Sequence, residues 1–534
     1  MIWGKTQTSR LAIAAAATVL ATNAMAADLG GNCCADLEER VAELEATTAR
    51  KGNRRVKLTV SGHVNETLLW WDDGEEKNTY VVTNVNSRTR FRFVGDAKIS
   101  ADWSAGYLLE IGVRTAGSDL VNQFADDTTT TNGALDLRHS AWWVENSKYG
   151  RLWVGLTSQA TDGITEINLS NVPGQLGGPD MSNFANSFFL RSSRGNLLAE
   201  QSVTSFPGIA SIRGLTWGNI APSTGDAWNA GDGYRRNLVK YVSPTFWGFN
   251  ASWSWGEDDF WDAALRYAGE FSSFRVAAGV GYQQWTDGDA TQVLPGAFFA
   301  PGNTFVNTNS QQNMPCADLD FARFGAFDNR VRNQDLSCDS VGLSASVMHV
   351  PTGLFVAGSW GRVTDYKRND LFADHIADVA PELVGTNAFR RFVSNGDDQD
   401  EHWFIQGGIE KNWFGLGKTS LFADYGHYKQ GIGLSGGNVN DFAFLLTPAA
   451  GFQNPASALI TNSSVDVWGV GIVQSIDAAA MDLYLGFRNF SGDADILVID
   501  RTVPTVDGTP TRFRKDKLDL QDFQAVMAGG IIRF

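Results

Sequence analysis

The residues whose types and spacing most clearly suggest a chemical role are arginines at every second position. Arg88, Arg90 and Arg92 alternate with Thr89 and Phe91, so an extended backbone would place the three guanidinium groups on one face. Further arginines fall on the same face of neighbouring predicted strands, namely Arg114, Arg138 and Arg151. A guanidinium stays protonated at physiological pH. Such a face would therefore supply a fixed positive field and not a bond-making group.

Acidic residues follow these arginines in a long polar segment, residues 161–232. The candidates there are Asp162, Glu166 and Asp180. If the segment folds opposite the arginines inside a hollow structure, the two sets of charges create a transverse field that orients polar solutes and resists apolar ones. A simpler interpretation is that the arginines only solvate the interior and pair with nearby acids such as Glu110. For the six arginines together we favour the wall of a pore.

Motifs for bond-making chemistry are weak. Gly417, Lys418 and Thr419 suggest a phosphate-binding loop, but Asn412 stands where that motif requires glycine, and a predicted strand follows where a helix is needed. The six histidines show no metal-ligand spacing, and no serine, histidine and aspartate group stands out. We therefore expect no enzymatic activity, no metal and no cofactor.

The composition indicates a large β protein. The 534 residues include 56 glycines and 12% aromatic residues, while charged residues make up 19% against about 25% in ordinary soluble domains. This apolar content excludes disorder. No apolar run reaches the ~18 residues of a membrane-spanning helix. The net charge of −16 makes nucleic acid an improbable partner, because phosphate binding requires clustered basic residues.

The N-terminus indicates export. Residues 1–26 contain Lys5 and Arg10, an apolar stretch at 11–21 and the small-residue cleavage pattern of residues 24–26, which together form a secretory signal. Without Lys5 and Arg10 the mature chain has 41 basic and 59 acidic residues, a net charge of −18.

A short segment with helical periodicity, residues 27–55, follows the signal. Leu37, Val41 and Leu44 have heptad spacing, but two heptads are too short to form a stable isolated helix. We expect a periplasmic helix that forms a coiled coil if the main body is oligomeric. Cys33 and Cys34 stand just before it, and their role stays open.

From residue 56 to residue 534 the apolar period changes to two, which predicts strands with one apolar and one polar face. Sixteen strands are predicted, approximately at 56–71, 87–99, 103–116, 134–146, 149–160, 233–243, 246–256, 260–271, 274–285, 340–350, 353–363, 402–411, 417–429, 464–474, 479–490 and 522–534.

The connections between these strands alternate between tight turns and loops that are mostly long and polar, with a short exception at Glu257. An even strand count with this alternation is typical of an all-β, antiparallel transmembrane barrel, and sixteen strands leave an aqueous lumen. Tryptophans near strand ends fit the aromatic girdles at the two membrane boundaries. The last strand ends on Phe534, as expected of a signal for the outer-membrane assembly machinery.

Several runs resemble the porin family of alphaproteobacteria, of the rhizobial general type: residues 56–62 (VKLTVSG), 160–164 (ATDGI), 235–241 (RRNLVKY), 243–246 (SPTF) and, most specifically, 255–267 (WGEDDFWDAALRY). The resemblance implies a homotrimer in the outer membrane of a Gram-negative bacterium, surrounded by lipids and lipopolysaccharide. It also implies a water-filled channel for small hydrophilic solutes and ions, with the third loop folded into the pore.

The long loops 161–232 and 286–339 depart from this family pattern, so pore width does not follow from the resemblance. Two other functions stay open, a substrate-specific uptake channel and an adhesive or structural barrel. The acidic mature chain predicts a weak cation preference, which the arginines oppose. In the loop 286–339, Cys316 and Cys338 are predicted to form a disulfide, because export exposes them to an oxidising environment.

Overall fold

The structure is a computed structural model, and it describes residues 56–113, 115–126, 135–180, 184–203, 210–221, 230–256, 260–288, 336–366, 397–431, 457–500 and 512–534. The predicted signal and the segment 27–55 lie outside these residues. No helix in the described part of the chain is long and apolar enough to cross a membrane.

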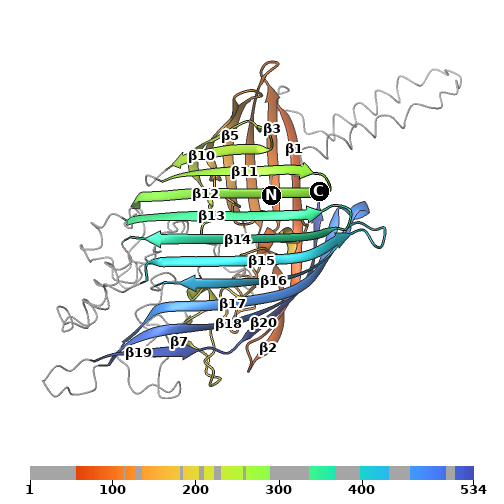
Figure 1. The fold of residues 1–534 in the computed structure, drawn as a ribbon. Coiled ribbons are helices and arrows are strands. Elements are labelled where there is room, and N and C mark those ends of the chain that lie inside the picture. Colours follow the sequence, from red (N-terminus) through yellow and green to blue (C-terminus); the bar gives the residue numbers. More distant parts are fainter. Residues whose placement is uncertain are drawn as a thin grey trace.

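Sixteen antiparallel strands form a closed barrel (Figure 1), as the alternating pattern predicts. The ring closes where the first strand pairs with the last, from His63 opposite Arg533 to Asp72 opposite Gln524. In chain order the barrel strands are β1 (Lys57–Asp72), β3 (Arg90–Lys98), β4 (Trp103–Val113), β5 (Leu135–Asn146), β6 (Gly150–Ser158), β9 (Arg235–Val242), β10 (Phe249–Gly256), β11 (Trp261–Phe271), β12 (Phe274–Gly288), β13 (Leu336–His349), β14 (Leu354–Asp365), β15 (Gln399–Lys411), β16 (Thr419–Gln430), β17 (Ser457–Ile476), β18 (Met481–Asp500) and β20 (Phe523–Arg533).

Two further strands, β2 (Lys77–Thr83) and β19 (Arg512–Asp519), extend the wall at its long-loop end. β2 pairs with the part of β1 beyond its contact with β3, and β19 pairs with the part of β18 beyond its contact with β20. Neither strand was predicted, because each occupies a segment assigned to a loop. A short 3-10 turn, η1 (Val85–Ser87), interrupts the wall between β2 and β3.

The remaining described elements are small. A two-stranded sheet of β7 (Ala199–Val203) and β8 (Ala210–Gly214) is separate from the barrel sheet. The short helices are α3 (Pro173–Leu176), η3 (Trp217–Asn219) and η7 (Asp477–Ala479). The chain terminus returns to the start of the barrel, because Phe534 and Gly62 exchange two backbone hydrogen bonds of 3.0 and 3.1 Å.

The two faces of the barrel wall differ in polarity, as β10 illustrates. Its outward residues, including Trp253 and Trp255, are about half exposed, whereas its inward residues Ser252 and Ser254 are buried. An apolar outer face suits lipid, and a polar inner face suits a lumen. Some tryptophans expected in the girdles instead point inward and are buried, namely Trp71, Trp143 and Trp285.

The largest hydrophobic cluster lies inside the barrel. Inward-facing residues of β1, β15, β16, β17, β18 and β20 contribute to it, as do residues of the long connection between β6 and β9. Phe188 of this connection, for example, packs against Trp71 and Phe523 with ring centroids 5.2 and 4.8 Å apart. The connection therefore fills part of the interior that sixteen strands would otherwise leave to water.

Candidate functional site

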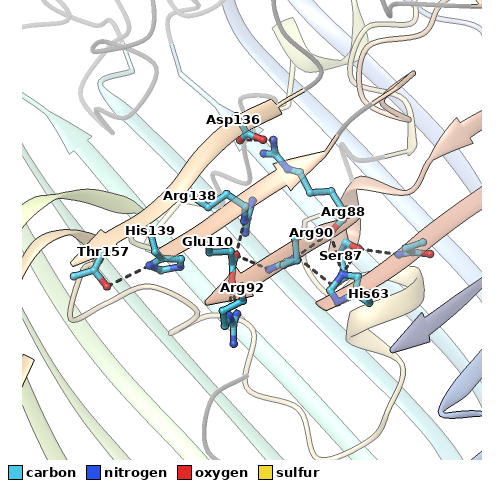
Figure 2. A network of polar contacts seen from close by, with 11 residues as sticks. His63, Ser87, Arg88, Arg90, Arg92, Glu110, Asp136, Arg138, His139 and Thr157 are labelled. Carbon is cyan, nitrogen blue, oxygen red and sulfur yellow. Dashed lines mark hydrogen bonds and ion pairs between the residues drawn. The ribbon is translucent and has the colours of Figure 1, made fainter. Parts of the chain in front are cut away.

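Glu110 of β4 is the centre of the arginine cluster (Figure 2). Its side chain is fully buried and accepts hydrogen bonds from three arginines. Arg90 approaches at 3.3 Å and Arg138 at 2.8 Å, both at Oε1, while Arg92 donates through Nε at 2.6 Å to Oε2. The pairing with Glu110 that the simpler interpretation proposed is thus present. One carboxylate shared by three guanidinium groups leaves an excess of positive charge.

A β-bulge brings Arg138 to this centre. The pairing of β4 with β5 shifts register between Glu110 and Ile111, so Arg138 and His139 are both buried on the inner side. Bulges commonly redirect a side chain in this way. His139 in turn lies 3.3 Å from the hydroxyl of Thr157.

Arg88 stands beside the cluster, just before β3. It forms a 2.8 Å ion pair with Asp136 of β5. His63 Nε2 lies 2.9 Å from the carbonyl oxygen of Arg88 and 3.0 Å from that of Ser87, so it can donate to both and fix the backbone at this point. Of the cluster's arginines, Arg92 is the most open, with 38% of its side chain exposed.

The other predicted arginines are not in this cluster. Arg151 lies near the short-turn end, pairs with Glu145 at 2.7 Å and stacks over Trp143 with its guanidinium 4.4 Å from the ring centroid. Arg114 lies outside the described residues. Arg235 of β9 was not among the predicted site residues, although its charge acts on Arg90, Arg138 and His139. Parity on β9 would not have identified it, because Arg235 shares its parity with the exposed Tyr241 and not with the buried Leu238.

The connection after β6 lies against the inner wall opposite β3 and β4. Backbone N–H groups of this segment donate to inward side chains of successive strands, at Thr161 to Asp262 (2.7 Å), Ile167 to Ser344 (3.2 Å), Leu169 to Ser346 (3.1 Å) and Asn171 to Glu410 (3.0 Å). Gln175 then reaches Asp482 of β18 at 2.6 Å. Residues 161–175 thus follow the inner faces of β11, β13, β15 and β18.

The three predicted acids all lie in this connection. Asp162 follows the hydrogen-bonded Thr161, Glu166 is exposed, and Asp180 is buried beyond α3. Burial opposes ionisation of Asp162, but Arg235 and a hydrogen bond from Ser158 outweigh it and hold the pKa of Asp162 below its usual value. Asp162 therefore stays negatively charged near the arginines.

Glu166 has the opposite electrostatic situation. The pKa of Glu166 is raised to about 7, mainly because the barrel encloses the side chain and partly because Asp180 and Asp162 are negatively charged. Some solvent still reaches the side chain. Asp232, which was not predicted, caps the same turn by accepting from Thr165 Oγ1 at 2.5 Å. Burial and the charges of Glu166 and Asp162 raise the pKa of Asp232.

Of the residues in the disulfide and coiled-coil predictions, only Cys338 lies within the described part of the chain. Cys338 of β13 is buried and disulfide-bonded, and it packs in a cluster with Leu238, Phe260 and Trp285. Cys316 and the heptad residues Leu37, Val41 and Leu44 lie outside the described residues, so the pairing and the coiled coil stay predictions.

Comparison with protein-family models identifies the chain. The model described as Gram-negative porin matches residues 12–495. The chain belongs to the Gram-negative porin family. It is therefore an outer-membrane barrel that forms a passive diffusion channel, and both its family and its fold indicate a channel rather than an enzyme. No curated protein matches this porin in sequence.

Solved porins with a similar chain path share little sequence with this porin. An anion-selective porin from Comamonas acidovorans has 12% identity and a TM-score of 0.43, with 90% of this chain and 100% of that one covered. OmpT of Vibrio cholerae has 10% identity and a TM-score of 0.42, with 91% of this chain and 99% of that one covered. OmpF of Salmonella typhi, in complex with daunomycin, has 12% identity and a TM-score of 0.43, with 90% of this chain and 98% of that one covered. We draw nothing about solutes or selectivity from likenesses of this degree.

Proposed function

We propose that this porin passes small hydrophilic solutes and ions through a constriction between two charged surfaces. One surface is the arginine wall, which we define as Arg88, Arg90, Arg92 and Arg138 with Arg235. The other is the connection after β6, which carries Asp162 and Glu166. The observation that carries the proposal is the chain of hydrogen bonds that ties residues 161–175 to the inner wall of the barrel.

The charges on the two surfaces support a transverse field. Within the arginine wall, one carboxylate, Glu110, is shared by Arg90, Arg92 and Arg138, so one negative charge faces three positive charges. Because Asp162 keeps its charge, a dipolar solute would be oriented between the surfaces, and an apolar solute would lose hydration without gaining compensating contacts. The mature net charge of −18 still favours a weak cation preference at low salt, which screening reduces.

Conductance across a planar bilayer tests this function. We expect ohmic current that rises linearly with salt, and reversal potentials that show a weak cation preference. Replacing Arg88, Arg90 and Arg92 by glutamine should increase that preference, whereas Arg275→Gln, in an exposed ion pair with Glu270, should leave it unchanged. If the triple variant folds and keeps the wild-type reversal potential, the arginine wall is not at the constriction.

A substrate-specific channel is the second candidate, and the three arginines that share the single carboxylate of Glu110 favour it. Saturation of the current by an added anionic solute would support that function over general diffusion. A chain that folds but gives no current would instead support the adhesive or structural function.

Further parts of the proposal rest on the sequence. The run 255–267 supports a place among the alphaproteobacterial, rhizobial-type porins, and this resemblance supports a homotrimer embedded in lipid and lipopolysaccharide. We expect the outer-membrane assembly machinery to recognise Phe534 at the end of the last strand. We propose no reaction, because the charged groups act on passing solutes through their field and not through bond-making.

A further inference from the structure

The inner face of β14, β15 and β16 carries a phenylalanine on each strand. Phe355, Phe404 and Phe422 point inward, yet each is 4–6% exposed. Inward side chains of a water-filled lumen would be solvated, so these rings must be covered. They belong to one cluster with Val172 and Leu176 of the connection after β6. This part of the wall is therefore a docking surface for the loop and not a surface for solutes.

A buried ion pair fixes the loop at this surface. Arg488 of β18 pairs through Nη1 with Asp424 of β16, and the two side chains are 2% and 0% exposed. Arg488 crosses the intervening strand β17 at Gly469, where an added Cβ would lie 2.4 Å from its Nη1. The absence of a side chain at Gly469 thus makes room for the pair.

Both partners continue into the loop. Arg488 Nη2 donates to the carbonyl oxygen of Leu176 at 3.0 Å. Asp424 Oδ2 accepts from Gln406 Nε2 at 3.1 Å, and Gln406 Oε1 accepts from Asn168 Nδ2 at 2.8 Å. The side chains of Arg488, Asp424 and Gln406, which we call the latch, therefore hold the loop at two points eight residues apart in sequence.

Close packing around the latch favours this one position of the loop. The guanidinium of Arg488 lies 5.3 Å from the ring centroid of Phe184. Leu176 packs against Gly486 so closely that an added Cβ would lie 2.8 Å from its Cδ2. Displacement of the loop would break the hydrogen bond from Arg488 to Leu176 and the one from Asn168 to Gln406. It would also return Val172 and Leu176 to water, which the hydrophobic effect opposes.

We propose that Arg488 and Asp424 are positioning residues for the pore. They hold the loop against β15 to β18, seal that half of the lumen and confine the solute path to the side of the arginine wall. This inference rests on the proposed constriction, since it explains what keeps one of its two surfaces in place.

The test compares single-channel conductance with protease access to residues 161–180, in full-length protein whose heat-modifiable mobility on gels shows folding. Arg488→Gln and Asp424→Asn should raise conductance and current fluctuations and should open the loop to cleavage. Gly469→Val should have the same effects on conductance and cleavage, because the valine side chain displaces Arg488 without removing a charge. Gly407→Ala is the matched control, since an added Cβ there meets only one atom within 4 Å, at 3.8 Å.

A milder variant covers the case in which the ion-pair variants do not fold. Asn168→Ala removes one attachment without leaving a charge unpaired, and should raise conductance by less than Arg488→Gln. Wild-type conductance in a folded variant with a cleavable loop would overturn the inference while leaving the porin function intact. A loop that stays protected in all folded variants would overturn it too. Absence of current from the wild-type protein would instead refute the proposed function.

Discussion

Glu110 is the residue on which the arginine cluster depends. It is fully buried and is the shared acceptor for Arg90, Arg92 and Arg138. Glu110→Gln keeps the shape but removes the negative charge, so three guanidinium groups would repel one another at short range. We expect the free energy of unfolding to fall by about 3–5 kcal/mol, as when a buried ion pair loses one partner. Urea unfolding in detergent would measure this.

The matched control for this prediction is Glu145→Gln. Glu145 pairs with Arg151, but both side chains are about one-third exposed, so solvent screens the pair and the loss should stay below about 1 kcal/mol. Equal losses for the two variants would show that Glu110 is not the electrostatic centre. In folded channels, Glu110→Gln should also move the reversal potential toward anion preference.

Glu166 should make selectivity depend on pH. Its pKa is raised to about 7, and an acid with a raised pKa is neutral below that value and charged above it. Cation preference should therefore increase between about pH 5 and about pH 9 as the loop gains negative charge. Reversal potentials across this range provide the measurement. Glu166→Gln should flatten the curve, and an unchanged curve in this variant would assign the effect to another group.

At the scale of elements, Cys338 of β13 anchors a disulfide at the barrel wall. This cysteine is disulfide-bonded, and Cys316 is the partner that we predict. A bridge over 22 residues would restrain the unfolded chain by about 3 kcal/mol on the entropic model. Peptide mapping without reduction should recover residues 316 and 338 in one linked species. Recovery of Cys338 linked to Cys33 or Cys34 would contradict the pairing.

At the scale of the whole molecule, we expect the segment 27–55 to lie on the periplasmic side of the barrel. Even-stranded barrels have both ends on the short-turn side, which is periplasmic, and Phe534 pairs with Gly62 at the start of β1. Three barrels held together would give two heptads the effective concentration that they lack alone. Leu37, Val41 and Leu44 would then form a three-stranded coiled coil.

Deletion of residues 28–52 tests this arrangement. The melting temperature of the trimer should fall, while single-channel conductance should stay nearly unchanged, because we expect the segment to lie away from the pore wall. Cross-linking in mild detergent supplies the oligomeric state, and a protein that is monomeric before deletion would remove the basis of the prediction. A large change in conductance with no change in trimer stability would indicate a plug or gate.

The sequence by itself determined the fold class, because polarity alternation predicts strands and their even number, with tight turns alternating with long loops, is typical of a transmembrane barrel. That local rule identified the sixteen barrel strands and the inward position of Arg90, Arg92 and Glu110. It also contained an unused signal. At Phe355, Phe404 and Phe422 both faces of the strand are apolar, which indicates that the inner face is covered by protein.

Only the tertiary structure decided how distant segments meet. The bulge that turns Arg138 toward Glu110 depends on strand register. Arg488 meets Asp424, 64 positions away, and Leu176, 312 positions away. β2 and β19 were missed because their pairing depends on where β3 and β20 end. Polarity alternation is a property of each strand alone, whereas register, loop docking and shared ion pairs arise only when the ring has closed.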